Sequence, residues 1–198
     1  MAQVKGNCSL AVCPLQQQAQ TIIVLPKTLR SQLAGAYAEQ SRSDFAIYSV
    51  YLQNTEECHR LHYLQMACEK IAKAYRLRDT QTFMEADLYS HVVFSRFIQS
   101  FLRTQQLKER YRSQDAKRRH IERYARSLAE DIEKLAPAVD REQTPANAEY
   151  PWVNGRVVSV PIHYHYPVTA ELAALAGQNF LGLIETVIED YDKITLSG

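Results

Sequence analysis

The fold is decided by one stretch of sequence, Cys58-His59-Arg60-Leu61-His62-Tyr63-Leu64-Gln65-Met66-Ala67-Cys68-Glu69-Lys70-Ile71-Ala72-Lys73-Ala74-Tyr75. Apolar side chains recur in it at helical spacing, alanines lie between them, and neither Gly nor Pro interrupts. This pattern predicts an amphipathic helix that other helices can approach closely, with an apolar face made of Leu61, Leu64, Cys68, Ile71 and Tyr75. The polar face is expected to carry His59, His62, Glu69 and Lys73. Glu69 and Lys73 are spaced for an ion pair one turn apart, which is worth about 0.2–0.5 kcal/mol.

Composition sets the class of protein. A chain of 198 residues that is 46% hydrophobic can bury one sizeable core, so we expect residues 1–26 to be a tail with an extended segment and residues 27–198 to be a single helical domain. Four cysteines, Cys8, Cys13, Cys58 and Cys68, are too few for a disulfide scaffold and predict reduced thiols. The longest apolar run near the start, Ile22–Leu25, is far too short for a signal or membrane segment. A cytoplasmic protein without membrane contact is predicted.

Apolar periodicity extends the helical prediction along the chain. It predicts helices over 57–77, 91–104 and 107–135, one or two helices between Lys27 and Asn54, and a last helix that Thr169 opens. Ser90 is a suitable N-cap for the segment that follows it. Residues 157–167 contain two prolines and read as an extended strap with little or no sheet. The predicted core is Leu64, Ala67, Cys68, Ile71, Phe94, Phe97, Ile98 and Phe101.

Charge is concentrated in one place although the chain carries a net charge of only +1. Residues 103–123 hold eight basic and three acidic side chains, a local net charge of +5. Lysine and arginine neutralise phosphates and tyrosine stacks on bases, so this stretch predicts an RNA-binding face. Its phosphate contacts would be Arg112, Lys117, Arg118, Arg119 and Arg123, with Tyr111 and Tyr124 as stacking residues. The alternative is a solvated helix face that pairs with the acidic end of the last helix.

Histidines offer two further patterns. His59 and His62 lie on one helix face with Glu69 two turns on, which could supply three metal ligands, but no Cys or His partner has a recognised spacing. We therefore expect no metal and no cofactor. His163 and His165 alternate with Tyr164 and Tyr166. This alternation favours an aromatic strap packed on the bundle over a binding site.

Three segments of the sequence, taken in order, resemble the pattern of a known family. Arg42-Ser43-Asp44-Phe45 is expected on a first helix, Leu64-Gln65-Met66-Ala67-Cys68-Glu69-Lys70-Ile71-Ala72-Lys73-Ala74 on a second, and Ser90-His91-Val92 at the start of a third. In this order they resemble the HEPN domain family, named for higher-eukaryote and prokaryote nucleotide-binding proteins. The resemblance implies an all-α, up-and-down helical bundle, commonly a homodimer. It also implies a role in toxin–antitoxin, abortive-infection or CRISPR-linked systems, often as a ribonuclease and often beside a nucleotidyltransferase.

The sequence differs from that family in the catalytic motif. Its catalytic members carry an Arg and a His separated by about four to six residues at the start of a late helix, where two copies activate the RNA 2′-hydroxyl across a dimer. Here the interval from Arg112 to His120 is one residue too long, and Arg156 to His163 fits only in an extended context. If the chain is a metal-independent endoribonuclease, His120 is the expected general base, with Arg112 or Arg119 stabilising the phosphorane charge.

Two functions follow from this sequence. The first is a HEPN-like RNA- or nucleotide-binding protein, a ribonuclease toxin or phage-defence component that uses the basic helical face. The alternative is a catalytically inactive helical module that binds a protein partner, such as a nucleotidyltransferase antitoxin or a defence-complex subunit.

Overall fold

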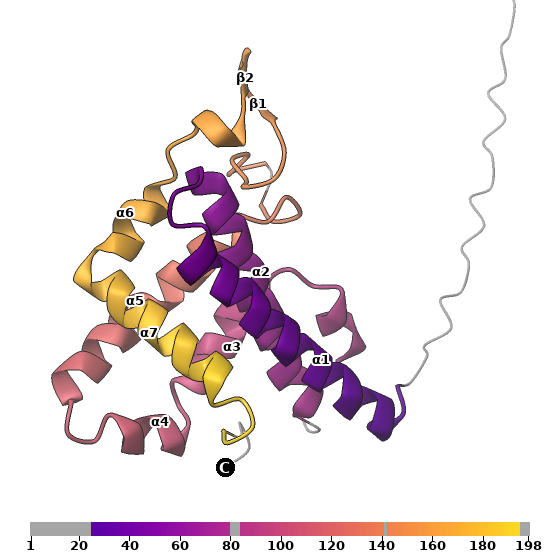
Figure 1. Ribbon diagram of the computed structural model, residues 1–198, viewed down its shortest axis with the longest axis vertical. Coiled ribbons are helices and arrows are strands. Elements are labelled where there is room, and N and C mark those ends of the chain that lie inside the picture. The colour runs from indigo at the N-terminus through magenta and orange to yellow at the C-terminus, as the bar shows by residue number, and fades with distance from the viewer. Residues whose placement is uncertain (1–24, 80–83, 141, 195–198) are drawn as a thin grey trace, which may run out of the picture.

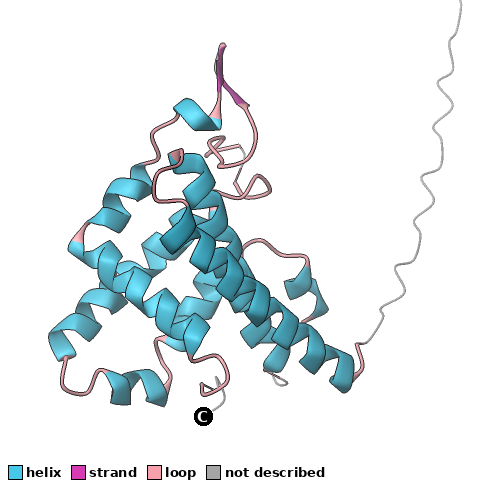
Figure 2. Ribbon diagram, viewed as in Figure 1, coloured by secondary structure: helices cyan, strands magenta, loops and turns pink. Residues whose placement is uncertain are grey.

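The computed structural model describes residues 25–79, 84–140 and 142–194. Most of the predicted N-terminal tail, including the β-branched segment before Leu25, lies outside these residues. The described chain is dominated by helices, with one two-stranded sheet (Figure 2). The all-α prediction with minor sheet is therefore confirmed.

Two long helices form the centre of the molecule. Helix α1 (Lys27–Ala46) continues into a π-helical turn (Ile47–Tyr51), and α2 (Glu57–Arg78) returns alongside it (Figure 1). Small buried residues meet at their interface, among them Ala34 and Ala38 of α1 and Ala67 of α2. The Ser41 hydroxyl donates a hydrogen bond to the Ala67 carbonyl at 2.7 Å. The predicted close approach of a neighbour to the decisive helix is thus made by α1.

Helices α3 (Phe94–Phe101), α5 (Asp115–Glu133) and α7 (Leu175–Glu189) pack around α2 and complete the core. Phe97 of α3 stacks on Tyr75 of α2 with ring centroids 4.9 Å apart, and Phe94 of α3 lies 6.2 Å from Phe180 of α7. All eight residues predicted for the core are at most 1% exposed, which confirms that prediction.

Two predicted helices are shorter than their apolar patterns. Helix α3 begins at Phe94, so Ser90 is not its N-cap; the Ser90 hydroxyl instead accepts a hydrogen bond from the Val92 N–H at 3.2 Å. The segment 107–135 is not one helix but α4 (Gln105–Arg110) and α5, separated by a turn from Tyr111 to Gln114. That turn lets the Tyr111 ring fold into the core, which local periodicity cannot anticipate.

The predicted strap begins as the second strand of a hairpin and continues as a short turn and irregular chain. Strands β1 (Trp152–Asn154) and β2 (Val157–Ser159) pair antiparallel through a turn in which Gly155 has φ 62°, and the hairpin projects from one end of the helices (Figure 1). A 3₁₀ turn (Pro161–His163) leads to α6 (Pro167–Ala173). Tyr166, rather than Thr169, stands at the N-cap of α6. Sheet pairing thus takes up only Val157–Ser159 of the predicted strap, and most of the remainder, up to Tyr166, is a 3₁₀ turn and irregular chain.

Candidate functional site

The basic residues lie on α4, on the turn after it and on the first half of α5. Ile121, Ala125 and Leu128 turn one side of α5 into the core, which leaves Arg119 and Arg123 exposed on the other side. Arg112 in the preceding turn and Lys117 are exposed as well, whereas Arg118 is half-buried. Four of the five predicted phosphate-contacting residues therefore occupy one solvent-exposed segment, beside α4 in Figure 1.

Ion pairs neutralise only part of this charge. Arg110 pairs with Asp190 at the end of α7 at 2.7 Å, and Arg118 pairs with Asp115 at 3.6 Å and Glu122 at 2.7 Å. The predicted pairing of the basic stretch with the acidic end of the last helix is therefore observed for Arg110. Among the residues that the structure describes, six exposed cations of this region form no ion pair. We call them the basic surface: Arg103, Lys108, Arg112, Lys117, Arg119 and Arg123.

The two tyrosines expected to stack on bases differ in exposure. Tyr111 is only 6% exposed, its burial raises its pKa, and the Lys117 ammonium lies 5.8 Å from its ring centroid. A ring packed in this way cannot stack on a base, so that prediction is wrong for Tyr111. Tyr124 is 39% exposed, and the His120 ring meets it edge-on at 5.1 Å. One aromatic face therefore adjoins the basic surface.

The predicted catalytic residues share this segment. Arg119 and His120 are consecutive on α5, and Arg112 lies in the turn before it. Within the described ranges no hydrogen bond or ion pair joins His120 to either arginine, and its ring lies against Tyr124 instead. The other Arg–His pair is on the hairpin side of the molecule, with Arg156 in the hairpin turn and His163 in the 3₁₀ turn after β2.

The polar residues of α2 that carry the family resemblance are turned inward. Glu69 Oε1 accepts a hydrogen bond from Lys73 Nζ at 2.6 Å, and its Oε2 accepts one from Gln65 Nε2 at 2.9 Å and lies 3.0 Å from His91 Nδ1. The Lys73 side chain is 6% exposed, so the expected solvent-facing pair is a buried one. Burial alone would raise the pKa of Glu69, but the hydrogen bonds and charges of Lys73 and His91 outweigh it and lower that pKa.

A second buried ion pair joins α1 to α2. Lys70 Nζ lies 2.5 Å from Asp44 Oδ2, and the Gln40 amide donates to Asp44 Oδ1 at 3.0 Å. The Asp44 side chain is only 4% exposed. Removing one member of a buried pair leaves an uncompensated charge, which costs about 3–5 kcal/mol. These contacts hold helices together and leave no polar group of Asp44 for a ligand.

The histidines considered as metal ligands are separated from one another. His59 is exposed, His62 Nδ1 lies 3.4 Å from Glu149 Oε1 on the segment before β1, and Glu69 is engaged within α2. In the described part of the chain no three His, Cys, Asp or Glu side chains are grouped to hold a metal ion. Of the strap, Tyr166 is buried, and Tyr164 packs between Tyr166 and Trp152, while His163 and His165 face solvent.

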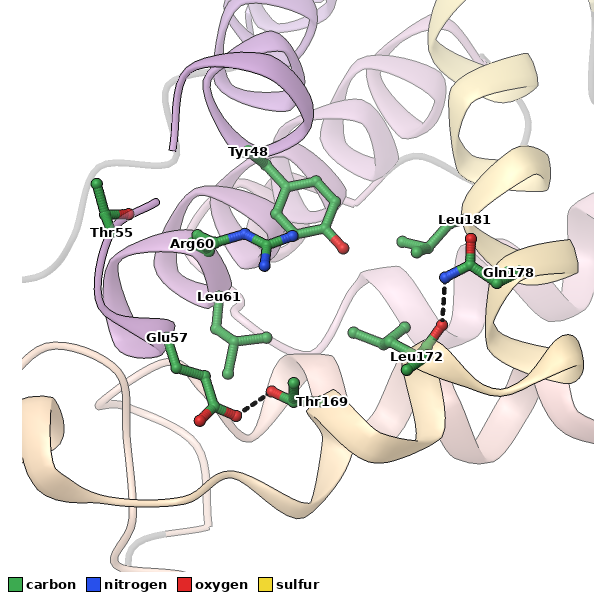
Figure 3. Close-up of a pocket in the computed structure, with 10 residues that line it drawn as sticks. Tyr48, Thr55, Glu57, Arg60, Leu61, Thr169, Leu172, Gln178 and Leu181 are labelled. Carbon is green, nitrogen blue, oxygen red and sulfur yellow. Dashed lines mark hydrogen bonds between the residues drawn. The ribbon is translucent and has the colours of Figure 1, made fainter. Parts of the chain in front are cut away.

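A pocket of about 280 Å³ lies between the start of α2, the π-helical turn, α6 and α7 (Figure 3). Its apolar wall is formed by Leu61, Leu172 and Leu181, and the Arg60 guanidinium lies over the Tyr48 ring at 5.4 Å from the centroid. Sequence reasoning overlooked Arg60 and Tyr48. The sequence offers one indication of a buried position for Arg60, which directly precedes Leu61 on the apolar face of the helix. The wall from α6 and α7 comes from more than a hundred residues further along the chain.

Comparison with known proteins adds no relative. None of the described helices is both long and apolar enough to cross a membrane. No protein-family model, curated protein or solved structure matches this chain.

Proposed function

We propose that this protein binds single-stranded RNA through the basic surface and is a helical protein of the HEPN type. The observation that carries the proposal is the set of six exposed cations on α4, α5 and the segments next to them that form no ion pair with the described residues, in a chain whose net charge is only +1. Each phosphate neutralised by such a side chain releases condensed counterions, which favours binding of a polyanion. Tyr124 adds an exposed ring on which a base can stack.

The HEPN part of the proposal is supported by the way the three resembling segments meet. Asp44 from the first segment pairs with Lys70 from the second, and Glu69 from the second contacts His91 from the third. The residues that carry the resemblance are therefore joined in space as well as in sequence order. Partly buried charge contacts of this kind help to fix how α1, α2 and the segment before α3 pack together.

The test is binding of a fluorescein-labelled, mixed-sequence single-stranded RNA, followed by fluorescence anisotropy. Affinity should fall steeply between about 50 and 200 mM salt. The triple variant Arg112→Gln, Arg119→Gln, Arg123→Gln should bind more weakly, and its plot of log affinity against log salt should be less steep by about 2, since each contact to a single strand contributes about 0.7. A matched control removes three exposed cations outside the basic surface, with Lys27→Gln, Arg96→Gln and Arg156→Gln, and should retain the wild-type slope.

Equal losses in both triple variants would show that general charge, and not this surface, attracts RNA. Absent or salt-insensitive binding by the wild type would refute the proposal and favour the protein-partner alternative. Cleavage is read from the same mixtures by gel electrophoresis. If RNA is cut, His120→Ala should abolish the cut while RNA binding persists, because His120 is the only imidazole on α4, α5 and the turn between them. Cleavage that survives this substitution would remove His120 as the general base.

A further inference from the structure

The pocket beside the start of α2 holds a guanidinium that lies over the Tyr48 ring but meets no hydrogen-bond acceptor in the described part of the chain. Arg60 Nε is buried and has no hydrogen-bond partner, and Arg60 forms no ion pair with any residue in 25–79, 84–140 or 142–194. Burying a guanidinium N–H without an acceptor is costly, and natural proteins normally pair such a group. The rest of the Arg60 side chain is only half-buried, which leaves its other N–H donors open to a ligand.

Most other polar groups around the pocket already form hydrogen bonds within the protein, so few remain to contact a ligand. Glu57 Oε1 accepts hydrogen bonds from the Thr169 hydroxyl and, at 3.3 Å, from the Tyr166 N–H (Figure 3). The Gln178 amide donates to the Leu172 carbonyl at 2.8 Å. The hydrogen bonds of Glu57 and Gln178 therefore hold α6 against α2 and α7.

Two donors remain for a ligand. The Arg60 guanidinium lies over the Tyr48 ring at the upper end of the pocket in Figure 3, and the phenol hydroxyl stands at the edge of that ring. The Tyr48 hydroxyl makes no hydrogen bond to the described residues. Burial raises the pKa of Tyr48, outweighing the lowering effect of Arg60, so the phenol stays protonated and able to donate. A fork of guanidinium donors with a hydroxyl beside it matches the two oxygens of a carboxylate.

The opposite side of the pocket is apolar. Leu61, Leu172 and Leu181 line it, and its volume of about 280 Å³ lies at the lower limit of small-ligand sites, which admits only a small molecule. The Glu57 carboxylate at the far end disfavours a second negative charge. We infer that this pocket binds a small organic monoanion, a carboxylate with an apolar tail, whose head meets Arg60 and Tyr48 and whose tail lies on the three leucines.

The inference is tested by isothermal titration calorimetry with octanoate and three probes of equal chain length: octanol, octylamine and octyl phosphate. Octanoate should bind saturably and about tenfold or more tightly than octanol, because a charge-assisted hydrogen bond to Arg60 is lost with the neutral head. Octylamine should not bind, and octyl phosphate should bind more weakly than octanoate. Equal affinity for octanoate and octanol, tighter binding of octyl phosphate, or no saturable binding of octanoate would overturn the inference.

Variants locate the site. Arg60→Met, which keeps the length of the side chain without its charge, should weaken octanoate binding about tenfold or more, and Tyr48→Phe should weaken it severalfold. The matched control Arg96→Met removes an exposed arginine of α3 and should leave the affinity unchanged. Leu181→Trp fills the pocket while retaining both donors, so it should abolish binding even if Arg60→Met fails to fold. Retained affinity in either Arg60→Met or Leu181→Trp would place the carboxylate elsewhere.

Discussion

Glu133 caps the N-terminal end of α3 from a different helix. It lies at the end of α5, is 5% exposed, and accepts a hydrogen bond from the Ser95 N–H at 2.8 Å in the first turn of α3. It therefore satisfies one of the N–H groups that the first turn of α3 leaves without a partner inside the helix. Burial raises the pKa of Glu133, and the hydrogen bonds from Ser95 and Phe94 offset this only in part. The same carboxylate, together with burial as the larger cause, raises the pKa of the Cys68 thiol.

The raised pKa of Glu133 predicts a definite pH dependence. The folded state holds this proton more tightly than the unfolded chain, so the free energy of unfolding falls as pH rises from the ordinary value of 4.5 through the raised one. Glu133→Gln cannot ionise and still accepts from Ser95, so its stability relative to wild type should be greater at pH 7 than at pH 4. Urea unfolding at both pH values measures the difference.

Two comparisons make this prediction specific. Glu133→Ala removes the acceptor and should cost about 1–3 kcal/mol through the unsatisfied Ser95 N–H. Glu185→Gln on the exposed face of α7 should leave the pH dependence unchanged. A Glu133→Gln variant that is less stable relative to wild type at pH 7 than at pH 4 would show that the ionised carboxylate is favoured at this site.

The junction between α6 and α7 depends on a close approach of two backbones. A Cβ atom at Gly177 would lie 2.2 Å from the Glu171 carbonyl oxygen and 2.3 Å from Leu172 Cα, distances that no side chain can occupy. Only glycine allows α7 to start directly against the end of α6. That arrangement places Leu172 and Gln178 on the pocket wall.

Substitution of two glycines in α7 tests this packing. Gly177→Ala should destabilise the protein by about 1–3 kcal/mol or more because backbone atoms must move apart. Gly182→Ala is the matched control: a Cβ there has no atom within 4 Å, and alanine in a helix interior should stabilise by about 1 kcal/mol. Thermal unfolding followed by circular dichroism compares them. Equal effects of the two substitutions would contradict the role given to Gly177.

The helices are joined into one core by an aromatic cluster. Tyr75 of α2 contacts Phe97 at 4.9 Å, Phe101 at 6.2 Å and Tyr191, after α7, at 5.1 Å, and its hydroxyl donates to the Val187 carbonyl at 3.1 Å. The cluster therefore links α2, α3 and α7, which are far apart in sequence. Its loss should affect the molecule as a unit and not one helix alone.

Phe97→Ala should lower the free energy of unfolding by about 3–5 kcal/mol, since the phenyl ring is fully buried and the cavity cannot close completely. Guanidinium unfolding followed by circular dichroism measures the change. Val158→Ala, on the exposed face of the hairpin, should stay within about 0.5 kcal/mol of wild type. Unchanged stability in Phe97→Ala would mean that the apolar face of α3 does not hold the core together.

Local patterns in the sequence determined the helical class, the extent of α2 and the eight core residues, because helical spacing of apolar side chains is a property of neighbouring residues. They also located the basic stretch, of which Arg112, Lys117, Arg119 and Arg123 are exposed and form no ion pair among the described residues. Charge concentrated along one segment needs no distant contact to be seen.

Only the tertiary structure decided what depends on distant partners. Glu69 meets His91 from the segment before α3 as well as Lys73 of its own helix, and Tyr111 is buried because a turn divides the predicted long helix. Arg60 became a pocket residue because α6 and α7 close over it. Periodicity gives the direction in which a side chain leaves its own helix. Whether that direction meets water or another helix depends on contacts between residues that are remote in sequence.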